Sequence, residues 1–431
     1  MSEKVITVSI LGTGARGGEA YGQYMFALKE RYKIVAICDI NPLKLQRFRK
    51  AFALSDAQCF LSEDDFFACK RSDLVVIATP DRLHVCMAKR ALALGYHVLL
   101  EKPISDNPSE LRELMQAAEQ AERQVIVCHV LRYTVMIRKL KEILDSGVIG
   151  KLVSIDQTEN VVYWHEAHSY VRGNWRKWEE TTPMIMAKCC HDLDLLQYFA
   201  GSRCETVSSM GSLAYFTQEN MPQGAAARCM DCKYQDTCTY SAKTIYLQGW
   251  KNRGCRGDDF PVTVITDEFP LTEEVIVKAL RQGPYGRCVF ACDNDVVDNQ
   301  TTIMQFENGI TATLKMEAFV KYGGRDIRFF GTDGELILNE AEDTITLKIF
   351  NGKDTVWRIG QLSDEYGGQG AGLHGGGDHR LIDKLYDILT NKTVNADTLL
   401  VNSVESHYMA IAAEESRLLG GETVALQRYR K

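Results

Sequence analysis

The sequence predicts two domains: an N-terminal α/β domain with a doubly wound parallel sheet, and a C-terminal α+β domain with a large, mostly antiparallel open sheet. Three observations predict this fold class. Short apolar segments alternate with amphipathic ones over the first 133 residues, which is typical of a parallel sheet covered by helices. The first apolar segment runs directly into a glycine-rich turn. Beyond residue 150, the expected strands come as hairpins.

The first domain is expected to span residues 1–133. Leu, Met and Ala recur at helical spacing in 85–94 and 109–122, and Asn107-Pro108 gives the second of these helices a start signal. Aliphatic and β-branched residues are concentrated in five expected strands, at residues 5–11, 34–39, 73–80, 97–103 and 124–133.

The second domain is expected to span residues 134–431, with a cysteine-rich insertion at about 216–265. Turn signals between apolar runs predict hairpins at Asn308-Gly309, Thr332-Asp333-Gly334 and Asn351-Gly352. Helical patterns are expected at residues 193–199, 381–389 and 398–419. A glycine-rich stretch, residues 367–377, precedes the second of these helices and can fold over a ligand, and Asp378 is the expected N-cap of that helix.

The glycine-rich turn is Gly12-Thr13-Gly14-Ala15-Arg16-Gly17. Gly12 permits the tight turn, Gly14 leaves no side chain between the backbone and a pyrophosphate, and Gly17 lets the next helix approach the strand. The second strand ends at Asp39, where a carboxylate can accept the hydroxyls of an adenosine ribose. The turn therefore predicts a dinucleotide site. Asp39 favours NAD because it repels a 2'-phosphate, while Arg16 keeps NADP open as an alternative.

Composition excludes several other classes of function. The 431 residues carry a formal net charge of -7, and no run of Lys and Arg offers a surface to nucleic acid. No apolar run approaches 18 residues, and no export signal precedes the first strand, so we expect a cytoplasmic protein without membrane contact. The 14 cysteines are then expected to be reduced thiols or metal ligands.

Two segments carry candidate proton-transfer groups. Lys102 lies at the carboxyl end of the fourth expected strand, at the sheet edge where ligands bind in such folds, and the alternative is a solvated lysine. Lys188 and His191 open the helix at 193–199, and helical spacing puts Lys188 and His191, or His191 and Asp194, on one face. His191 suits proton transfer with an alcohol, and the alternative is a structural histidine.

The segment from His165 to Arg176 is expected to be a ligand-lining loop, because it has no clean helical or strand period. His165, His168, Arg172 and Trp175 can hold hydroxylated or anionic molecules. Four thiols in the insertion predict a structural zinc site, with an iron–sulfur cluster or unligated thiols as alternatives. These thiols are Cys229, Cys232, Cys238 and Cys255.

Taken together, five motifs resemble the glucose-fructose oxidoreductase / inositol dehydrogenase family, Gfo/Idh/MocA. They are GTGARG at 12–17, ATPDRLH at 78–84, EKP at 101–103, HDLD at 191–194 and GGGDH at 375–379. The resemblance covers nearly the whole chain. It implies a Rossmann domain, a C-terminal domain that often mediates oligomers, here a dimer or tetramer, and NAD(P)-dependent chemistry on sugars or cyclitols.

The resemblance also implies roles for particular residues. Lys102 is the lysine that touches substrate and nicotinamide, and His191 is the histidine of the catalytic pair. The chain departs from the family at Ala187, where members with a D-x-x-x-H pair have a carboxylate, so proton transfer falls to His191 with Lys102, or to Lys188. Further cofactor contacts are implied for Thr79, Pro80, His84, Glu101, Trp175 and Arg176, and polar pocket positions for Arg132, Tyr133, Asp192 and His374.

The expected function is hydride transfer between a secondary alcohol of a sugar, sugar acid or cyclitol and nicotinamide. One alternative is a glycosidase that oxidises a sugar hydroxyl transiently, eliminates the leaving group and returns the hydride; His165 and His168 are its candidate extra bases. The other alternative is a sugar-sensing protein that keeps NAD as a ligand without turnover.

Overall fold

The computed structural model describes residues 4–257, 259–365, 373–390 and 397–431. Its first sheet contains six parallel strands in the order β3-β2-β1-β4-β5-β6, as predicted for a doubly wound domain. The strands are β1 (Ile6–Leu11), β2 (Tyr32–Cys38), β3 (Cys59–Phe60), β4 (Leu74–Ile77), β5 (His97–Leu100) and β6 (Val125–Val127). The predicted last strand is shorter than expected, because residues 130–133 form the 3-10 helix η4 (Val130–Tyr133).

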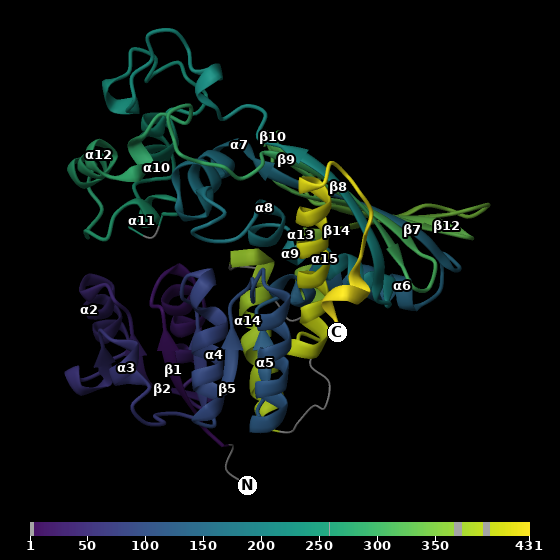
Figure 1. Ribbon diagram of the computed structural model, residues 1–431, viewed down its shortest axis with the longest axis horizontal. Helices are drawn as coiled ribbons and strands as arrows, with labels where there is room; N and C mark the ends of the chain where they lie inside the picture. The colour runs from purple at the N-terminus through teal and green to yellow at the C-terminus, as the bar shows by residue number, and fades with distance from the viewer. Residues whose placement is uncertain (1–3, 258, 366–372, 391–396) are drawn as a thin grey trace.

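Helices cover both faces of this sheet (Figure 1). The predicted helix at 109–122 is confirmed, and the Asn107 side chain caps it by accepting from Ser109 N. The helices are the π-helical η1 (Ala15–Gly22), α1 (Gln23–Ala27), α2 (Pro42–Ala51), η2 (Asp56–Gln58), α3 (Glu63–Phe66), η3 (Asp81–Leu83), α4 (His84–Ala93), α5 (Pro108–Ala121) and α6 (Val135–Asp145).

The second sheet has nine strands in the order β14-β13-β12-β11-β7-β10-β9-β8-β15. β10 pairs with β7 in parallel and the other neighbours are antiparallel, which confirms the mostly antiparallel sheet and all three hairpins. The strands are β7 (Leu152–Val162), β8 (Cys204–Ser212), β9 (Asn299–Phe306), β10 (Thr311–Val320), β11 (Gly324–Gly331), β12 (Gly334–Asn339), β13 (Thr344–Ile349), β14 (Thr355–Arg358) and β15 (Val424–Ala425).

One face of this sheet packs against α9 (Cys190–Ala200) and α15 (Leu400–Leu418). The chain then returns to the first domain: α14 (Gly377–Leu389) buries Leu381, Leu385 and Tyr386 in the same apolar cluster as β1. Figure 1 shows α14 beside the first sheet and α15 beside the second. The returning helix brings its glycine-rich entry to the glycine turn of residues 12–17.

The segment 165–176 is helical, so the loop prediction was wrong. It forms α7 (Tyr163–Glu166), the π-helix η5 (Ala167–Arg172) and the 3-10 helix η6 (Asn174–Arg176). A π-helix has i→i+5 bonding and therefore a different period from an α-helix, which explains why no clean period was visible. Ala167 and Val171 are buried in an apolar cluster.

That cluster also includes Phe216, Tyr246 and Trp250, so the cysteine-rich insertion shares an apolar core with η5. In Figure 1 its helices α10 and α11 gather with α12 at the end of the second sheet away from β12. The remaining helices are α8 (Met184–Ala187), η7 (Gln218–Asn220), η8 (Cys229–Asp231), η9 (Lys243–Gln248), α10 (Gly249–Asn252), α11 (Val262–Ile265), α12 (Glu273–Gln282), η10 (Pro284–Gly286), α13 (Ile359–Glu365), η11 (Leu373–Gly376) and η12 (Leu426–Tyr429).

Two sequence expectations concern the glycine-rich stretch before α14. Residues 366–372 lie outside the described part of the chain, so the structure says nothing of the loop expected there. Asp378 is not the N-cap of α14: Gly376 occupies that position, and the Asp378 carboxylate accepts from Arg16 and His374. In the described part of the chain, no helix is both long and apolar enough to cross a membrane.

Candidate active site

The glycine turn after β1 has the geometry that a pyrophosphate needs. Gly12 has a φ of +83°, and a Cβ there would lie 2.3 Å from the Ala78 carbonyl oxygen. A Cβ on Gly17 would lie 2.1 Å from the Gly12 carbonyl oxygen, so only glycine lets helix and strand approach this closely. A Cβ on Gly14 would meet nothing within 4 Å. The three glycines therefore fit a dinucleotide, with open space where its phosphates would approach the backbone.

Asp39 is fixed at the end of β2 beside this turn. Its Oδ2 accepts hydrogen bonds from Thr13 N at 2.7 Å and Thr13 Oγ1 at 2.9 Å, and its Oδ1 accepts from Asn41 N at 2.9 Å. The side chain is half-buried. A negative charge therefore stands at the strand end where these folds bind the adenosine ribose.

Arg16 links three segments that are far apart in the sequence. Its Nε lies 2.7 Å from Glu101 Oε1, and its Nη2 lies 2.5 Å from Asp378 Oδ1. Tyr21 contacts Arg16 and donates from its hydroxyl to Glu101 Oε1 at 2.6 Å. We call these four residues the Arg16 network. Because two carboxylates neutralise the guanidinium, Arg16 is less available to a phosphate than the sequence suggested.

The opposite charges in the Arg16 network stabilise one another against the cost of burial. Burial opposes ionisation of Asp378, yet hydrogen bonds from His374 and Arg16 lower its pKa to about 2. Burial likewise opposes ionisation of Glu101, whose pKa is nevertheless lowered by the positive charges of Arg16 and Lys102. Both carboxylates are thus ionised at neutral pH, and loss of one leaves Arg16 unbalanced in a partly buried site.

The loop after β4 is joined to the same strand ends through His84. The buried His84 ring places Nδ1 2.6 Å from the Pro103 carbonyl oxygen and Nε2 2.8 Å from the Thr79 carbonyl oxygen. His84 thereby holds the Thr79-Pro80 turn against the Glu101-Lys102-Pro103 segment. Because both ring nitrogens contact backbone carbonyl oxygens, His84 positions the segments of the predicted cofactor site.

Lys102 points from this edge toward the second domain. Its Nζ donates to the Ala187 carbonyl oxygen at 3.1 Å. Ala187 is the position at which the sequence lacks the carboxylate of its relatives, and here the backbone carbonyl at that position orients the lysine. Lys102 is therefore a held group beside the start of α9, and the alternative of a freely solvated lysine does not fit this contact.

His191 lies in the first turn of α9 and is 7% exposed. Burial, together with the positive charge of Lys102, lowers its pKa well below the ordinary histidine value. No described residue hydrogen-bonds its Nδ1. His374, from the glycine-rich entry to α14, lies over it with ring centroids 6.1 Å apart. His191 is therefore neutral at physiological pH, which is the form of an imidazole that can accept a proton.

Lys188 is held by a buried ion network. Its Nζ lies 2.9 Å from Glu159 Oε1, while Glu159 Oε2 lies 2.9 Å from Arg325 Nη2. Arg325 also pairs with Asp192, which accepts a further hydrogen bond from Gln157. Burial opposes the charge on Lys188, but Glu159 raises its pKa. Lys188 and Asp192, predicted as catalytic and substrate-binding groups, are both engaged with protein partners here.

Three other predicted substrate ligands come from α7 and η5. His165 lies close enough to Lys188 and Lys102 for their charges to add to the effect of burial, which lowers its pKa well below the ordinary value. His168 faces the insertion instead: its Nδ1 lies 2.9 Å from the Tyr246 hydroxyl and its ring stacks on Tyr285. Arg172 is buried and donates to the carbonyl oxygens of Arg287 and Tyr240.

Trp175 and Arg176 join η6 to neighbouring segments. The Trp175 indole donates to Asp81 Oδ2 at 3.2 Å, which places it against the loop after β4 in the first domain. Arg176 pairs with Asp293 through Nε at 2.8 Å and Nη2 at 3.0 Å. Trp175 therefore lies where a residue of the second domain can reach the cofactor edge of the first.

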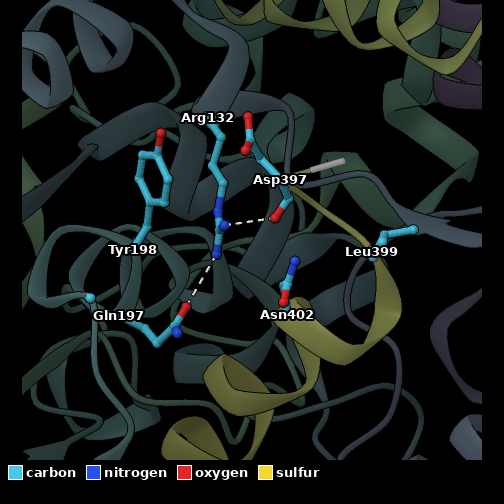
Figure 2. A pocket seen from close by; sticks show the side chains of 7 residues that line it. Arg132, Gln197, Tyr198, Asp397, Leu399 and Asn402 are labelled. Carbon is cyan, nitrogen blue, oxygen red and sulfur yellow. Dashed lines mark hydrogen bonds between the residues drawn. The ribbon is translucent and has the colours of Figure 1, made fainter. Parts of the chain in front are cut away.

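Arg132 and Tyr133 lie elsewhere than the candidate proton-transfer groups. Arg132 makes two 2.7 Å hydrogen bonds to the Asp194 carboxylate and also donates to the Asp397 carbonyl oxygen. Arg132 lines a pocket of about 380 Å³ together with Gln197, Tyr198 and Asn402, among others (Figure 2). Neither Lys102 nor His191 lines this pocket. The Tyr133 hydroxyl is 2.9 Å from Thr398 Oγ1.

The structure does not confirm the zinc site predicted at four cysteines of the insertion. Within the described ranges, no group of three or more His, Cys, Asp or Glu side chains can hold a metal ion. Cys229 accepts from Arg172 Nη2 at 3.4 Å, and Cys232 accepts from the backbone N of Ala226 and Tyr234. Cys255 is exposed. An apolar cluster that includes Phe216, Tyr246 and Trp250 also packs within the insertion.

Sequence reasoning missed several residues of the site. Glu159 and Arg325 lie on β7 and β11, and no local pattern signals that they would meet beside Lys188. Glu166 has 1% exposure, burial raises its pKa well above the ordinary value, and its Oε2 has no partner among the described residues. His129 is fully buried near His191. Its position after β6, at the carboxyl edge of the sheet, was an available signal.

Comparison with known proteins agrees with this geometry. Residues 6–129 match the oxidoreductase family with an NAD-binding Rossmann fold (GFO_IDH_MocA), and residues 141–396 match the C-terminal alpha/beta domain of the same family. The chain belongs to the Gfo/Idh/MocA oxidoreductase family, as its motifs predicted, and it is an NAD-dependent oxidoreductase.

Similar proteins include the oxidoreductase YteT of Bacillus subtilis (strain 168), which is 24% identical over 89% of this chain and 91% of its own length. A glycosyl hydrolase family 109 protein of Solibacter usitatus is 27% identical over 51% of this chain and 54% of its own length. A levoglucosan dehydrogenase solved with NADH and levoglucosan has a TM-score of 0.70 at 16% identity, covering 98% of this chain and all of that one.

Buried neutral histidines predict a loss of stability at mildly acidic pH. Burial lowers the pKa of His407 to about 3. In the unfolded chain His407 becomes protonated near pH 6.5, whereas in the folded protein it stays neutral at that pH. The free energy of unfolding therefore falls as pH drops below 6.5. We expect His407→Gln to reduce the loss of unfolding free energy between pH 7 and pH 5 by about 2 kcal/mol, measured by urea unfolding.

The comparison between pH 7 and pH 8 is the internal control, because histidine is neutral there in both states. Between pH 7 and pH 8, the free energies of unfolding of wild type and His407→Gln should differ by a constant amount. Equal pH dependence of wild type and His407→Gln between pH 7 and pH 5 would contradict the assignment of a buried neutral ring.

Proposed function

We propose that the enzyme transfers hydride between a secondary alcohol of a sugar, sugar acid or cyclitol and NAD. The observation that carries the proposal is the pairing of Lys102, held by the Ala187 carbonyl, with the neutral, buried His191 at the carboxyl edge of the first sheet. Oxidation of an alcohol requires a proton acceptor beside the carbon that loses hydride. A cation next to a neutral imidazole is suited to bind the hydroxyl and accept its proton.

When bound, NAD supplies the hydride acceptor. The chain's own groups do the rest: Lys102 hydrogen-bonds the substrate oxygen, and His191 accepts the hydroxyl proton as the carbon–oxygen bond gains double-bond character. Lys188 stays a cation because Glu159 raises its pKa, so its role is to orient the start of α9 rather than to act as the base. Trp175, held by Asp81, closes the site against water.

NAD is proposed as the cofactor in preference to NADP. Asp39 places a carboxylate at the ribose end of the site, and Arg16, the possible partner of a 2'-phosphate, is neutralised by Glu101 and Asp378. The levoglucosan dehydrogenase of similar fold was solved with NADH.

Redox-assisted glycoside cleavage is the second candidate. The resemblance to a glycosyl hydrolase family 109 protein over half of the chain favours it, as does Glu166, a buried carboxyl that burial keeps protonated beside Lys188. Elimination of a leaving group needs an acid in addition to the base that removes the C–H proton. Glu166 and His165 are the residues of this chain that suit those extra steps.

The assembly and location are also proposed. Met210 and Ile303, on the neighbouring strands β8 and β9, are 65% and 56% exposed, and an apolar sheet face of this kind supports a homodimer or tetramer. All 14 cysteines carry free thiols, which suits the reducing cytoplasm. No structural zinc is proposed.

The two functions give different products from one assay. The purified protein is incubated with NAD and with D-glucose, myo-inositol, D-glucuronate and p-nitrophenyl glycosides, following NADH and nitrophenol together. Net NADH from a free sugar is the expected result. His191→Gln and Lys102→Met should each lower kcat by about 10²- to 10⁴-fold while NAD still binds. Nitrophenol release without NADH would replace the dehydrogenase with the glycosidase, and full activity of either variant would remove that residue from the mechanism.

Cofactor choice is tested at Asp39. The substitution Asp39→Asn removes the charge and keeps an oxygen for Thr13 N, so we expect the ratio of kcat/KM with NADP to that with NAD to rise about tenfold. Asp56→Asn, in the same domain, is the matched control and should leave the ratio unchanged. An unchanged ratio in Asp39→Asn would mean that Asp39 does not face the ribose.

A further inference from the structure

Four histidine rings form a row through the site. The ring centroids of His374 and His191 are 6.1 Å apart, those of His191 and His129 5.8 Å, and those of His129 and His407 5.7 Å. The row begins at the glycine-rich entry to α14, passes the proposed base and ends in α15. Two of these rings have evident roles, because His191 adjoins Lys102, and His407 accepts from Ile104 N at 2.8 Å.

His129 is different from an ordinary structural histidine. It is 0% exposed, and among the described residues neither of its ring nitrogens has a hydrogen-bond partner. The Nδ1 of the neighbouring His191 also has none. A buried polar group without a partner costs about 1–3 kcal/mol, so packing alone does not account for imidazole at this position. Phenylalanine would fill the same space without that cost.

Charged groups surround His129 on both sides. Asp194 Oδ2 lies 3.7 Å from its Nδ1, and that carboxylate is paired with Arg132. Burial, followed by the positive charges of Arg132 and Lys102, lowers the pKa of His129 well below the ordinary value, while Glu101 opposes this. Burial and Lys102 also lower the pKa of His191. Burial and the positive charge of Lys102 thus disfavour protonation of both rings.

We propose that His129 is a proton relay for the oxidation assigned to this site, taking from His191 the proton that the substrate hydroxyl releases. In each turnover the C–H bond gives its electron pair and hydrogen to NAD as hydride, and the O–H proton goes to His191. That proton then passes to His129, directly or through one water, and Asp194 stabilises the imidazolium. When product leaves, the proton returns from His129 to His191 and passes from there to solvent, because His129 itself has no exposed surface. The relay rests on the proposed dehydrogenase function.

The test compares His129→Gln, which retains hydrogen bonding but carries no titratable proton, with His129→Phe, which retains only ring packing. The substrate is the compound of the panel from which wild type forms NADH fastest. With it, both variants are expected to lower kcat by about 10- to 100-fold and to leave KM and NAD affinity little changed. The solvent deuterium isotope effect on kcat should increase in both. Recovery of the wild-type kcat in His129→Gln would overturn the relay in favour of a positioning role.

His407→Gln is the matched control, because it alters the ring on the other side of His129 within the same buried row. It should lower the melting temperature and leave kcat close to wild type. An equal fall of kcat in His407→Gln and His129→Gln would overturn the relay, because it would assign the effect to general disturbance of the buried row.

A second readout is independent of substrate. Ring ¹⁵N spectra of the histidines are recorded against pH in wild type and His129→Phe. Because His129 lowers the pKa of His191, removal of His129 should move the His191 transition to higher pH. An unchanged His191 signal would overturn the relay. Absence of NADH from every panel member would contradict the proposed function, while these spectra would still decide whether the two rings interact.

Discussion

The candidate site depends on one ion network, in which Arg16 joins the glycine turn to Glu101 and Asp378. These three residues belong to the first helix after β1, the end of β5 and the start of α14. Glu101 precedes Lys102 and also accepts from Lys102 N, so the network at the glycine turn also fixes the backbone of the proposed substrate-binding lysine. Cofactor geometry and proton-transfer geometry therefore have a shared support.

The second domain contributes a comparable buried network on its own side. Glu159 from β7 and Arg325 from β11 hold Lys188 and Asp192 at the start of α9, which orients His191 between them. The two supports meet at the hydrogen bond from Lys102 to the Ala187 carbonyl. A loss of charge in either network would therefore displace Lys102 and His191 relative to each other. Neither residue is itself a member of these networks.

Sequence reasoning was most successful where local chemistry determines structure. The glycine turn, the hairpins at Asn308-Gly309 and Asn351-Gly352, and the helix starting after Asn107 follow from short-range rules. It failed where distant residues decide the outcome. Arg16 pairs with Asp378 across more than 360 positions, and η5 takes a π-helical form around the insertion core. The four-cysteine pattern predicts a metal site, but spacing alone does not reveal whether the thiols converge, and the described residues contain no group of three or more side chains able to hold a metal.

The most direct test of this account is a double-mutant cycle between Arg16 and Asp378, read through the NAD dissociation constants of wild type, Arg16→Met, Asp378→Asn and the double variant. If the ion pair shapes the glycine turn, each single substitution weakens NAD binding and the double variant is little worse than either. The expected coupling energy is about 1–3 kcal/mol. Strictly additive effects would contradict the account, because they would show that the start of α14 does not act on the cofactor site through Arg16.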